Sequence, residues 1–345
     1  MVSKPFRNVL LAFSILALAV ARSPSAGLKE FVMPVVSPKA IPEIDGEVSR
    51  DEWARAVSLT GFSHFKTRQI GPRQAHAFFV ADRKNLYFAL VSPLSSKGGK
   101  PKAHKWNRDS LQEAFKDERI EISIVPPKSH KRGSFYLMAS FSGSIYDHRL
   151  NPETAKEDKG WDAEWVLRQE VEGDKWHFEL KVPLTDLGLP EGQPAGGIWK
   201  LNISRVWSGS KKNISGLNWD PHKGAEVRFI PGAPALHMEK LGDLCKGKLD
   251  LLFSINSSPA TPEGKEISNP EELEITCVVR DHETGKTLVR ENKTLALKDS
   301  GKAKIGIKKD FQPGSKNQLL LLVRDADGGT NYYFSSLDFS GSDGP

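Results

Sequence analysis

Short segments in which apolar and polar residues alternate dominate the chain from residue 75 onward. In one of them, three isoleucines at every second position enclose Glu121 and Ser123. A period of two residues is typical of β-strands with one buried face. Only Asp51 to Val57 and Leu184 to Leu187 have the pattern of single helical turns. The sequence therefore predicts an all-β protein whose first part is an antiparallel β-sandwich or a flattened barrel.

A loop-rich junction with three prolines follows Trp219, and the alternating pattern resumes after Gly242. Five further strands are expected there: Leu249 to Ile255, Leu273 to Val279, Thr287 to Leu297, Ala303 to Ile307 and Gln318 to Val323. This second part predicts a smaller sandwich of the immunoglobulin or fibronectin type. The predicted division is a signal peptide at 1–21, an N-terminal extension at 22–39, the first sandwich at 40–243, the second at 244–340 and a tail at 341–345.

The N-terminus has the pattern of an export signal. Lys4 and Arg7 precede an apolar run that ends at Val20, and small residues follow it up to Ala21. We expect cleavage after Ala21, because this run is too short to cross a bilayer and small residues suit a signal peptidase. The mature protein is then secreted or periplasmic, and no further stretch predicts a membrane span.

Charge and cysteine content exclude some classes of partner. The formal net charge of +6 falls to about +4 once Lys4 and Arg7 are removed, and the remaining charges are mixed along the chain. No block of basic residues interleaved with aromatics appears, which argues against nucleic acid. The two cysteines, Cys245 and Cys277, are candidates for a single disulfide in or beside the second part. The oligomeric state cannot be inferred.

Several short motifs, in the same order and at similar spacing, resemble family-9 carbohydrate-binding modules over about residues 40 to 243. The motifs are Ile44-Asp45-Gly46-Glu47, Asp51-Glu52-Trp53 with Ala56, Asn85 to Ala89, Arg119 to Ile122, and Gly197 to Arg205. The resemblance implies a β-sandwich whose concave sheet holds a sugar, often a chain end, between two tryptophan rings. It also implies a non-catalytic role, in the uptake or breakdown of polysaccharide.

A pyranose ring suits such a site because flat aromatic rings cover its C–H faces while polar side chains bind its hydroxyls. All eight tryptophans lie between Trp53 and Trp219. The resemblance makes Trp106 and Trp219 the candidate platforms. Alternation directs Glu121 away from the isoleucine face, with Tyr136 and Asn202 as candidate neighbours on the same surface. Arg205 shares the parity of Trp199 and would need a bulge or a strand end to reach a ligand.

The other tryptophans are expected to be structural. Trp176 and Trp199 fall on apolar strand faces and are predicted core residues, whereas Trp53 is expected to close one end of the sandwich. For Trp161, Trp165 and Trp207 the sequence favours packing in the core or at the rim and does not decide between the two. Residues Leu111 to Asp117 lengthen the connection between Trp106 and Glu121 relative to the family and predict a short helix beside the site.

Other chemistry finds less support. No GxSxG, HExxH or phosphate-binding glycine loop occurs, and the acidic residues are scattered, so no enzyme is predicted. A haem-binding β-sandwich of the related cytochrome or dehydrogenase type would need Met138 with His76 or His237 as axial ligands. A surface or assembly module with a degenerate sugar groove is the other alternative. No cofactor is predicted; calcium has no loop motif, since the turn at Asp325 to Gly329 lacks a downstream glutamate.

Overall fold

The computed structural model confirms an all-β chain. It describes residues 28–71, 73–94, 103–105, 107–127, 133–154, 156–189, 196–207, 214–218, 223–257, 270–297 and 302–341. Within these ranges the chain forms 21 strands and only short helical turns, which are η1 (Pro38–Ala40), η2 (Glu52–Arg55), α2 (Leu111–Ala114) and η4 (Leu244–Lys246). The predicted helical turn after Asp51 and the short helix after Trp106 are therefore confirmed. The predicted signal peptide, 1–21, lies outside the described residues.

One layer, which we call sheet A, runs the whole length of the molecule. Its strands, in spatial order, are β10 (Val166–Glu172), β11 (Lys175–Pro183), β5 (Asn85–Pro93), β4 (His76–Ala81), β2 (Val57–Leu59), β15 (Ala235–Asp243), β16 (Lys248–Asn256) and β19 (Lys302–Asp310). The parallel contact between β2 and β15, where Ser58 pairs with His237, joins the two halves of this sheet.

The opposite layer, sheet B, is also continuous. Its strands, in spatial order, are β9 (Glu157–Asp158), β8 (Ile145–Leu150), β7 (Ser134–Ser140), β6 (Arg119–Val125), β12 (Trp199–Val206), β14 (Ala225–Pro231), β1 (Lys29–Val35), β21 (Asn331–Phe339), β20 (Asn317–Asp325), β17 (Glu272–Asp281) and β18 (Thr287–Ala296). A side branch, β13 (Ile214–Gly216), pairs with β12 and with β3 (Ser63–His64).

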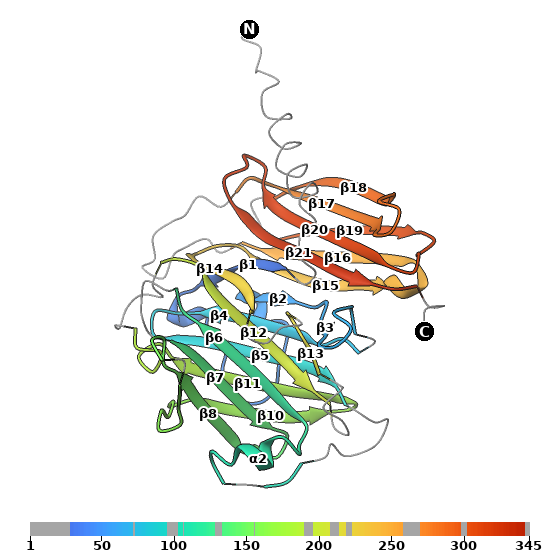
Figure 1. Cartoon of the computed structure of the whole chain (residues 1–345). Helices are drawn as coiled ribbons and strands as arrows, with labels where there is room; N and C mark the ends of the chain where they lie inside the picture. Colours follow the sequence, from blue (N-terminus) through green and yellow to red (C-terminus); the bar gives the residue numbers. More distant parts are fainter. Residues whose placement is uncertain are drawn as a thin grey trace.

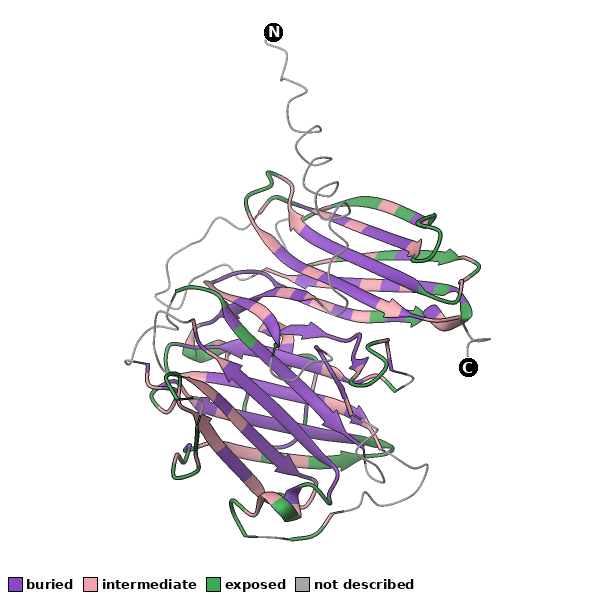
Figure 2. Cartoon of the chain, viewed as in Figure 1, coloured by how far each residue is buried: buried purple, intermediate pink, exposed green. Residues whose placement is uncertain are grey.

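The core lies between the two sheets because every second residue of the central strands is apolar. Ile120, Ile122 and Ile124 face this core, as alternation predicts, and so do the tryptophans at 176 and 199. A single apolar cluster includes residues of both parts, for example Phe88 and Phe253. Figure 2 shows the buried residues running along the strands of both sheets.

Strand β1 connects the two parts of the molecule within sheet B. It pairs in parallel with β14 and antiparallel with β21, so the first and last described strands are neighbours. Figure 1 shows β1 and β14 lying between the two parts. The segment 22–39, predicted as an extension, thus contributes Lys29–Val35 to the body of sheet B. Because both sheets pass through the junction, the division into separate domains at residue 243 stays a prediction.

The cysteines differ from expectation. Cys245 and Cys277 are both free thiols, one half-buried and the other buried, so the predicted disulfide between them is corrected. Cys277 lies in the core of the second part, where burial raises the pKa of its thiol to about 12. A neutral buried thiol of this kind is a packing residue.

None of the helices in the described ranges has both the length and the apolar composition that a membrane crossing requires.

Candidate functional site

The predicted binding surface is a row of polar side chains on the outer face of sheet B. We call it the polar face and define it by Glu121, Ser123, Tyr136, Asn202 and Ser204. Strand register aligns them across three strands: Glu121 lies opposite Ser204, and Ser123 lies opposite both Asn202 and Tyr136. The structure therefore brings together three of the predicted site residues, and it adds two serines that the sequence analysis did not select.

Glu121 forms the centre of a hydrogen-bonded group. Its Oε1 atom lies 2.6 Å from Arg119 Nη2, and its Oε2 atom accepts a 2.6 Å hydrogen bond from the Tyr136 hydroxyl. Burial and the negative charge of Glu121 raise the pKa of Tyr136 well above its usual range, so this hydroxyl stays a donor. Only 6% of Glu121 is exposed. The carboxylate is therefore held in one orientation.

Asn202 fixes the chain that leads to Trp219. Its Oδ1 atom accepts a 2.9 Å hydrogen bond from the backbone N–H of Asn218, and its Nδ2 atom donates to the Asn218 carbonyl at 3.2 Å. Strand β13 comes close to the polar face here, since a Cβ atom on Gly216 would lie 2.6 Å from Ser204 Oγ. A glycine at this position lets the two strands approach.

Arg205 does not belong to this face. It is fully buried on the core side of β12, the side shared with Trp199, and the register of β12 with β6 has no bulge to turn it outward. Its guanidinium forms an ion pair with Glu118 and lies 4.7 Å and 4.5 Å from the ring centroids of Trp176 and Trp207. The prediction of a ligand contact for Arg205 is therefore corrected: its surroundings are those of a structural ion pair.

Trp106 and Trp219 lie outside the described residues, so their predicted role as platforms stays a prediction. The described residues close to them in the sequence form hydrogen bonds within the chain. His104 Nδ1 lies 2.8 Å from an oxygen of Asp117, just before β6, and Arg108 donates to Asp147 at 3.0 Å. On the other side, Asn218 precedes Trp219 directly and bonds to Asn202.

Trp53 has a different place from the one expected. It does not close the end of the sandwich but packs on the outer face of sheet A, in an apolar cluster with Phe78 and Tyr87. Its Nε1–H donates a 2.8 Å hydrogen bond to Glu179 Oε1, while Oε2 accepts from the backbone N–H groups of Asp45 and Gly46. The motifs around Asp45 and Trp53 therefore fasten the segment before β2 onto sheet A.

We expect Trp53→Phe to lower the free energy of unfolding by about 1–3 kcal/mol, because it removes a hydrogen bond to a buried carboxylate and leaves a gap. Trp165→Phe is the matched control, since Trp165 Nε1 has no hydrogen-bond partner among the described residues. Urea unfolding measures both. A smaller loss for Trp53→Phe than for the control would contradict this role.

The haem alternative does not fit the arrangement of its candidate ligands. Met138 is buried on the outer face of sheet B, against Ala114 and Tyr146. His76 and His237 lie on the outer face of sheet A, where they line one pocket. The two sheets and the core lie between Met138 and these histidines. They cannot bind one iron atom.

Two groups of three carboxylates come within 4.8 Å of one another in the described residues. In the first, Asp45, Glu52 and Glu179, the buried member is the acceptor for Trp53 and two backbone N–H groups. In the second, Asp109, Asp147 and Asp162, each carboxylate contacts the guanidinium of Arg108 within 3.8 Å. Both groups already have internal donors or a counter-ion, so neither favours calcium.

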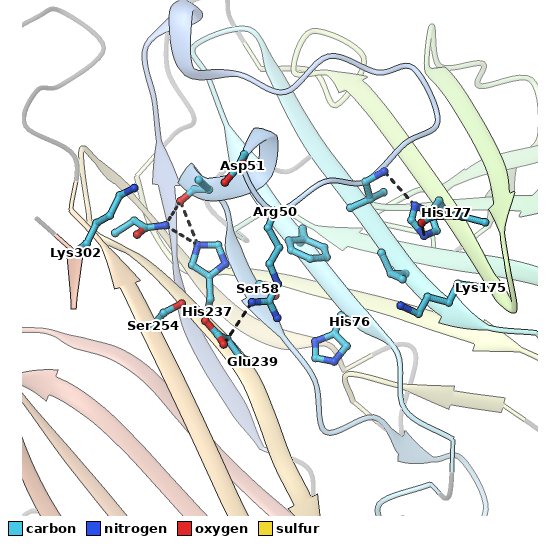
Figure 3. A pocket seen from close by; sticks show the side chains of 16 residues that line it. Arg50, Asp51, Ser58, His76, Lys175, His177, His237, Glu239, Ser254 and Lys302 are labelled. Carbon is cyan, nitrogen blue, oxygen red and sulfur yellow. Dashed lines mark hydrogen bonds and ion pairs between the residues drawn. The ribbon is translucent and has the colours of Figure 1, made fainter. Parts of the chain in front are cut away.

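Two of the pockets formed by the described residues lie near residues named above. One, of about 420 Å³, lies beside Trp207 and includes Arg73 and Ser215, with the Arg73 guanidinium 5.2 Å from the indole centroid. Because two guanidiniums, those of Arg73 and Arg205, contact this ring, little of it remains for stacking a ligand. The other pocket, of about 480 Å³, crosses sheet A at the junction of the two parts (Figure 3). The sequence carried no signal for it, because its residues come from eight separate strands and from the segment between Val48 and Ala54.

No protein-family model and no curated relative matches this chain. Among solved structures, a family-9 carbohydrate-binding module from Caldicellulosiruptor kristjanssonii is similar in complexes with cellotriose and with glucose. The identities are 12% and 13%, the TM-scores 0.40 and 0.38, and the matches cover 58% of this chain and 93% and 95% of those chains. A provisionally assigned carbohydrate-binding protein from Bacteroides uniformis matches with 9% identity and a TM-score of 0.46, over 58% of this chain and 99% of that chain. The family suggested by the sequence motifs is thus also found among the structural neighbours. These low values carry no argument about the ligand, which depends on the site itself.

Proposed function

We propose that the chain is an exported, non-catalytic carbohydrate-binding protein that holds a saccharide on the polar face of sheet B. Export rests on the N-terminal pattern of Lys4 and Arg7 before an apolar run that ends in small residues. The ligand class rests on the polar face. The proposed role in the uptake or breakdown of polysaccharide rests on the resemblance of the sequence motifs to family-9 modules.

One observation carries the proposal: five polar side chains occupy neighbouring positions on three adjacent strands of a sheet face. Burying polar groups costs free energy, so a face that only packed against a covering segment would be more stable with apolar side chains. An ionised carboxylate, a hydroxyl and an amide in fixed positions suit the hydroxyl groups of a sugar. Trp106 and Trp219 would then cover the faces of the ring.

A second reading is an assembly module whose sugar groove is degenerate. It is favoured by one observation: the carboxylate of Glu121 and the amide of Asn202 already have partners within the chain. On this reading no saccharide binds, and the polar face only holds the segments that flank it. A binding experiment separates the two.

The test is a glycan array probed with the chain from Arg22 onward and with its Trp106→Ala and Trp219→Ala variants. We expect the wild type to retain at least one glycan and each variant to bind it at least about tenfold more weakly, since losing a central tryptophan contact removes 2 kcal/mol or more. Val171→Ala is the control, because Val171 is an exposed hydrophobic residue of β10, on the other sheet. Binding that is equally strong in all four proteins would refute the site, and no retained glycan would favour the assembly module.

A further inference from the structure

The pocket on sheet A forms only because the two parts of the molecule share that sheet. One row of its floor runs from His237 through Ser58 to Phe78, each paired with the next across neighbouring strands. A second row runs from His76 through Val91 to His177. We call this pocket the junction groove. Arg50 and Asp51 line one side of the junction groove. Ser254, Asn256 and Lys302 line the end that lies on the second part.

His177 offers the groove a hydrogen-bond donor. Its Nδ1 atom accepts a hydrogen bond from the backbone N–H of Val48 at 3.2 Å, so in the neutral ring Nε2 carries the proton. This buried Nε2–H has no hydrogen-bond partner in the described part of the chain. The nearest carboxylate, that of Glu172, lies 3.5 Å away and is 77% exposed, which places it at the rim.

The opposite end of the groove offers acceptors. His237 Nε2 lies 3.1 Å from the Ala54 carbonyl, which can only accept, so this nitrogen carries the proton and Nδ1 is left as an acceptor. Asn256 Nδ2 donates to the same carbonyl at 2.9 Å, which leaves the amide oxygen of Asn256 available. Donor and acceptor groups thus stand on either side of an apolar patch formed by Phe78, Val91 and Val48.

The charge at the His76 end of the groove is positive. Burial is the largest cause that lowers the pKa of His76, and the positive charges of Arg50 and Lys175 lower it further. Figure 3 shows Arg50 and Lys175 on either side of His76. Glu239, a half-buried carboxylate of the groove, contacts two cations, Arg50 at 3.4 Å and Lys304 at 3.0 Å. Glu172 lies opposite Lys175 across β10 and β11, but its side chain is 77% exposed and stands at the rim. An anionic group placed near His76 would therefore meet the cations of Arg50 and Lys175, with Glu172 as the carboxylate at the edge of the groove.

We propose that the junction groove binds an anionic saccharide, with its carboxylate or sulfate group between Arg50 and Lys175. The sugar ring lies against Phe78 and Val91, and its hydroxyl groups bond to His177, His237 and Asn256. The combination of a charged end, an apolar floor and neutral hydrogen-bonding groups is that of a sugar with one acidic substituent. This site is separate from the polar face, which lies on the other sheet.

The test uses three soluble probes: an oligogalacturonate, which carries carboxylates, dextran sulfate, which carries sulfates, and dextran as the neutral reference. Calorimetric titration of the wild type is expected to give binding to at least one anionic probe and at least tenfold weaker binding to dextran. The double variant Arg50→Gln/Lys175→Gln is expected to lose tenfold or more of that affinity. The probe that binds identifies the acidic group.

The matched control is Lys286→Gln/Arg290→Gln, which removes the same two charges from exposed positions of the second part, around β18. It is expected to keep the wild-type affinity. The proposal is overturned if the wild type binds neither anionic probe better than dextran. It is also overturned if the groove variant binds as the wild type does, or if the control loses as much affinity as the groove variant.

Glu121→Gln separates this inference from the proposed function. It changes the polar face only, so the affinity for the anionic probe is expected to stay within twofold of the wild type. If the array finds no ligand for the polar face while the anionic probe still binds through Arg50 and Lys175, the proposed function fails and the junction groove stands. A neutral glycan that binds through Glu121, with no anionic binding, is the reverse result.

Discussion

Replacing Arg205 by Met is expected to lower the free energy of unfolding by about 3–5 kcal/mol, which is the usual cost of removing one member of a buried ion pair. The side chains of Arg205 and Glu118 are both fully buried. The guanidinium also lies against two indole rings and donates to Ser92 Oγ at 3.2 Å. Methionine would keep most of the volume but leave the charge of Glu118 without its counter-ion.

Urea unfolding measures this loss. Arg290→Met is the control, because Arg290 is exposed and a surface change of this kind alters stability by about 0.5 kcal/mol or less. The double variant Arg205→Met/Glu118→Gln is expected to recover part of the loss, since no unpaired charge remains in the core. Either of two results would show that the ion pair of Arg205 and Glu118 does not stabilise the core. One is a loss below about 1 kcal/mol for Arg205→Met, and the other is a double variant less stable than the single one.

Lys29→Met is expected to stabilise the protein at pH 6 by up to about 5 kcal/mol, because methionine removes the cost of holding a charged ammonium in the core. Lys29 is fully buried in β1, where its ammonium donates a 2.5 Å hydrogen bond to the Gly61 carbonyl. Burial lowers the pKa of Lys29 to about 7 from an ordinary value of 10.5. Between these two values the unfolded chain binds a proton that the folded chain does not, so this residue makes stability rise with pH.

The gain from Lys29→Met should therefore be full below pH 7 and shrink towards pH 10.5, where the lysine is neutral in both states. Unfolding of both proteins at pH 6 and at pH 9.5 gives the difference directly, because other titrating groups cancel between them. An equal gain at the two pH values would mean that Lys29 is charged in the folded protein, and the burial argument would be wrong.

Local pattern predicted much of this structure. The alternation around Glu121 correctly predicted that its side chain lies on the face opposite the isoleucines. In β12, alternation correctly predicted that Arg205 and Trp199 share the core face. It was the expected ligand contact of Arg205, carried by family resemblance, that was wrong. Alternation reports side-chain direction because successive side chains of a strand point to opposite faces.

Long-range pairing could not be predicted in this way. Strand β1 joins β14 and β21, which lie about 200 and 300 positions further along the chain, and no local pattern specifies such partners. The junction groove has the same origin, since His237 and Ser58 meet only through the contact of β15 with β2. Trp53 was misplaced because its hydrogen bond to Glu179 depends on a strand 126 positions away.

The polar face is tested most directly by titrating the best array glycan into three proteins: the wild type, Glu121→Gln and the groove variant Arg50→Gln/Lys175→Gln. Replacing the carboxylate of Glu121 by an amide removes a charged hydrogen bond worth about 1.5–3 kcal/mol, so the affinity is expected to fall about 10- to 100-fold. The groove variant is expected to bind this glycan as the wild type does. Unchanged affinity in Glu121→Gln, with loss in the groove variant, would place the saccharide on the wrong sheet for this account.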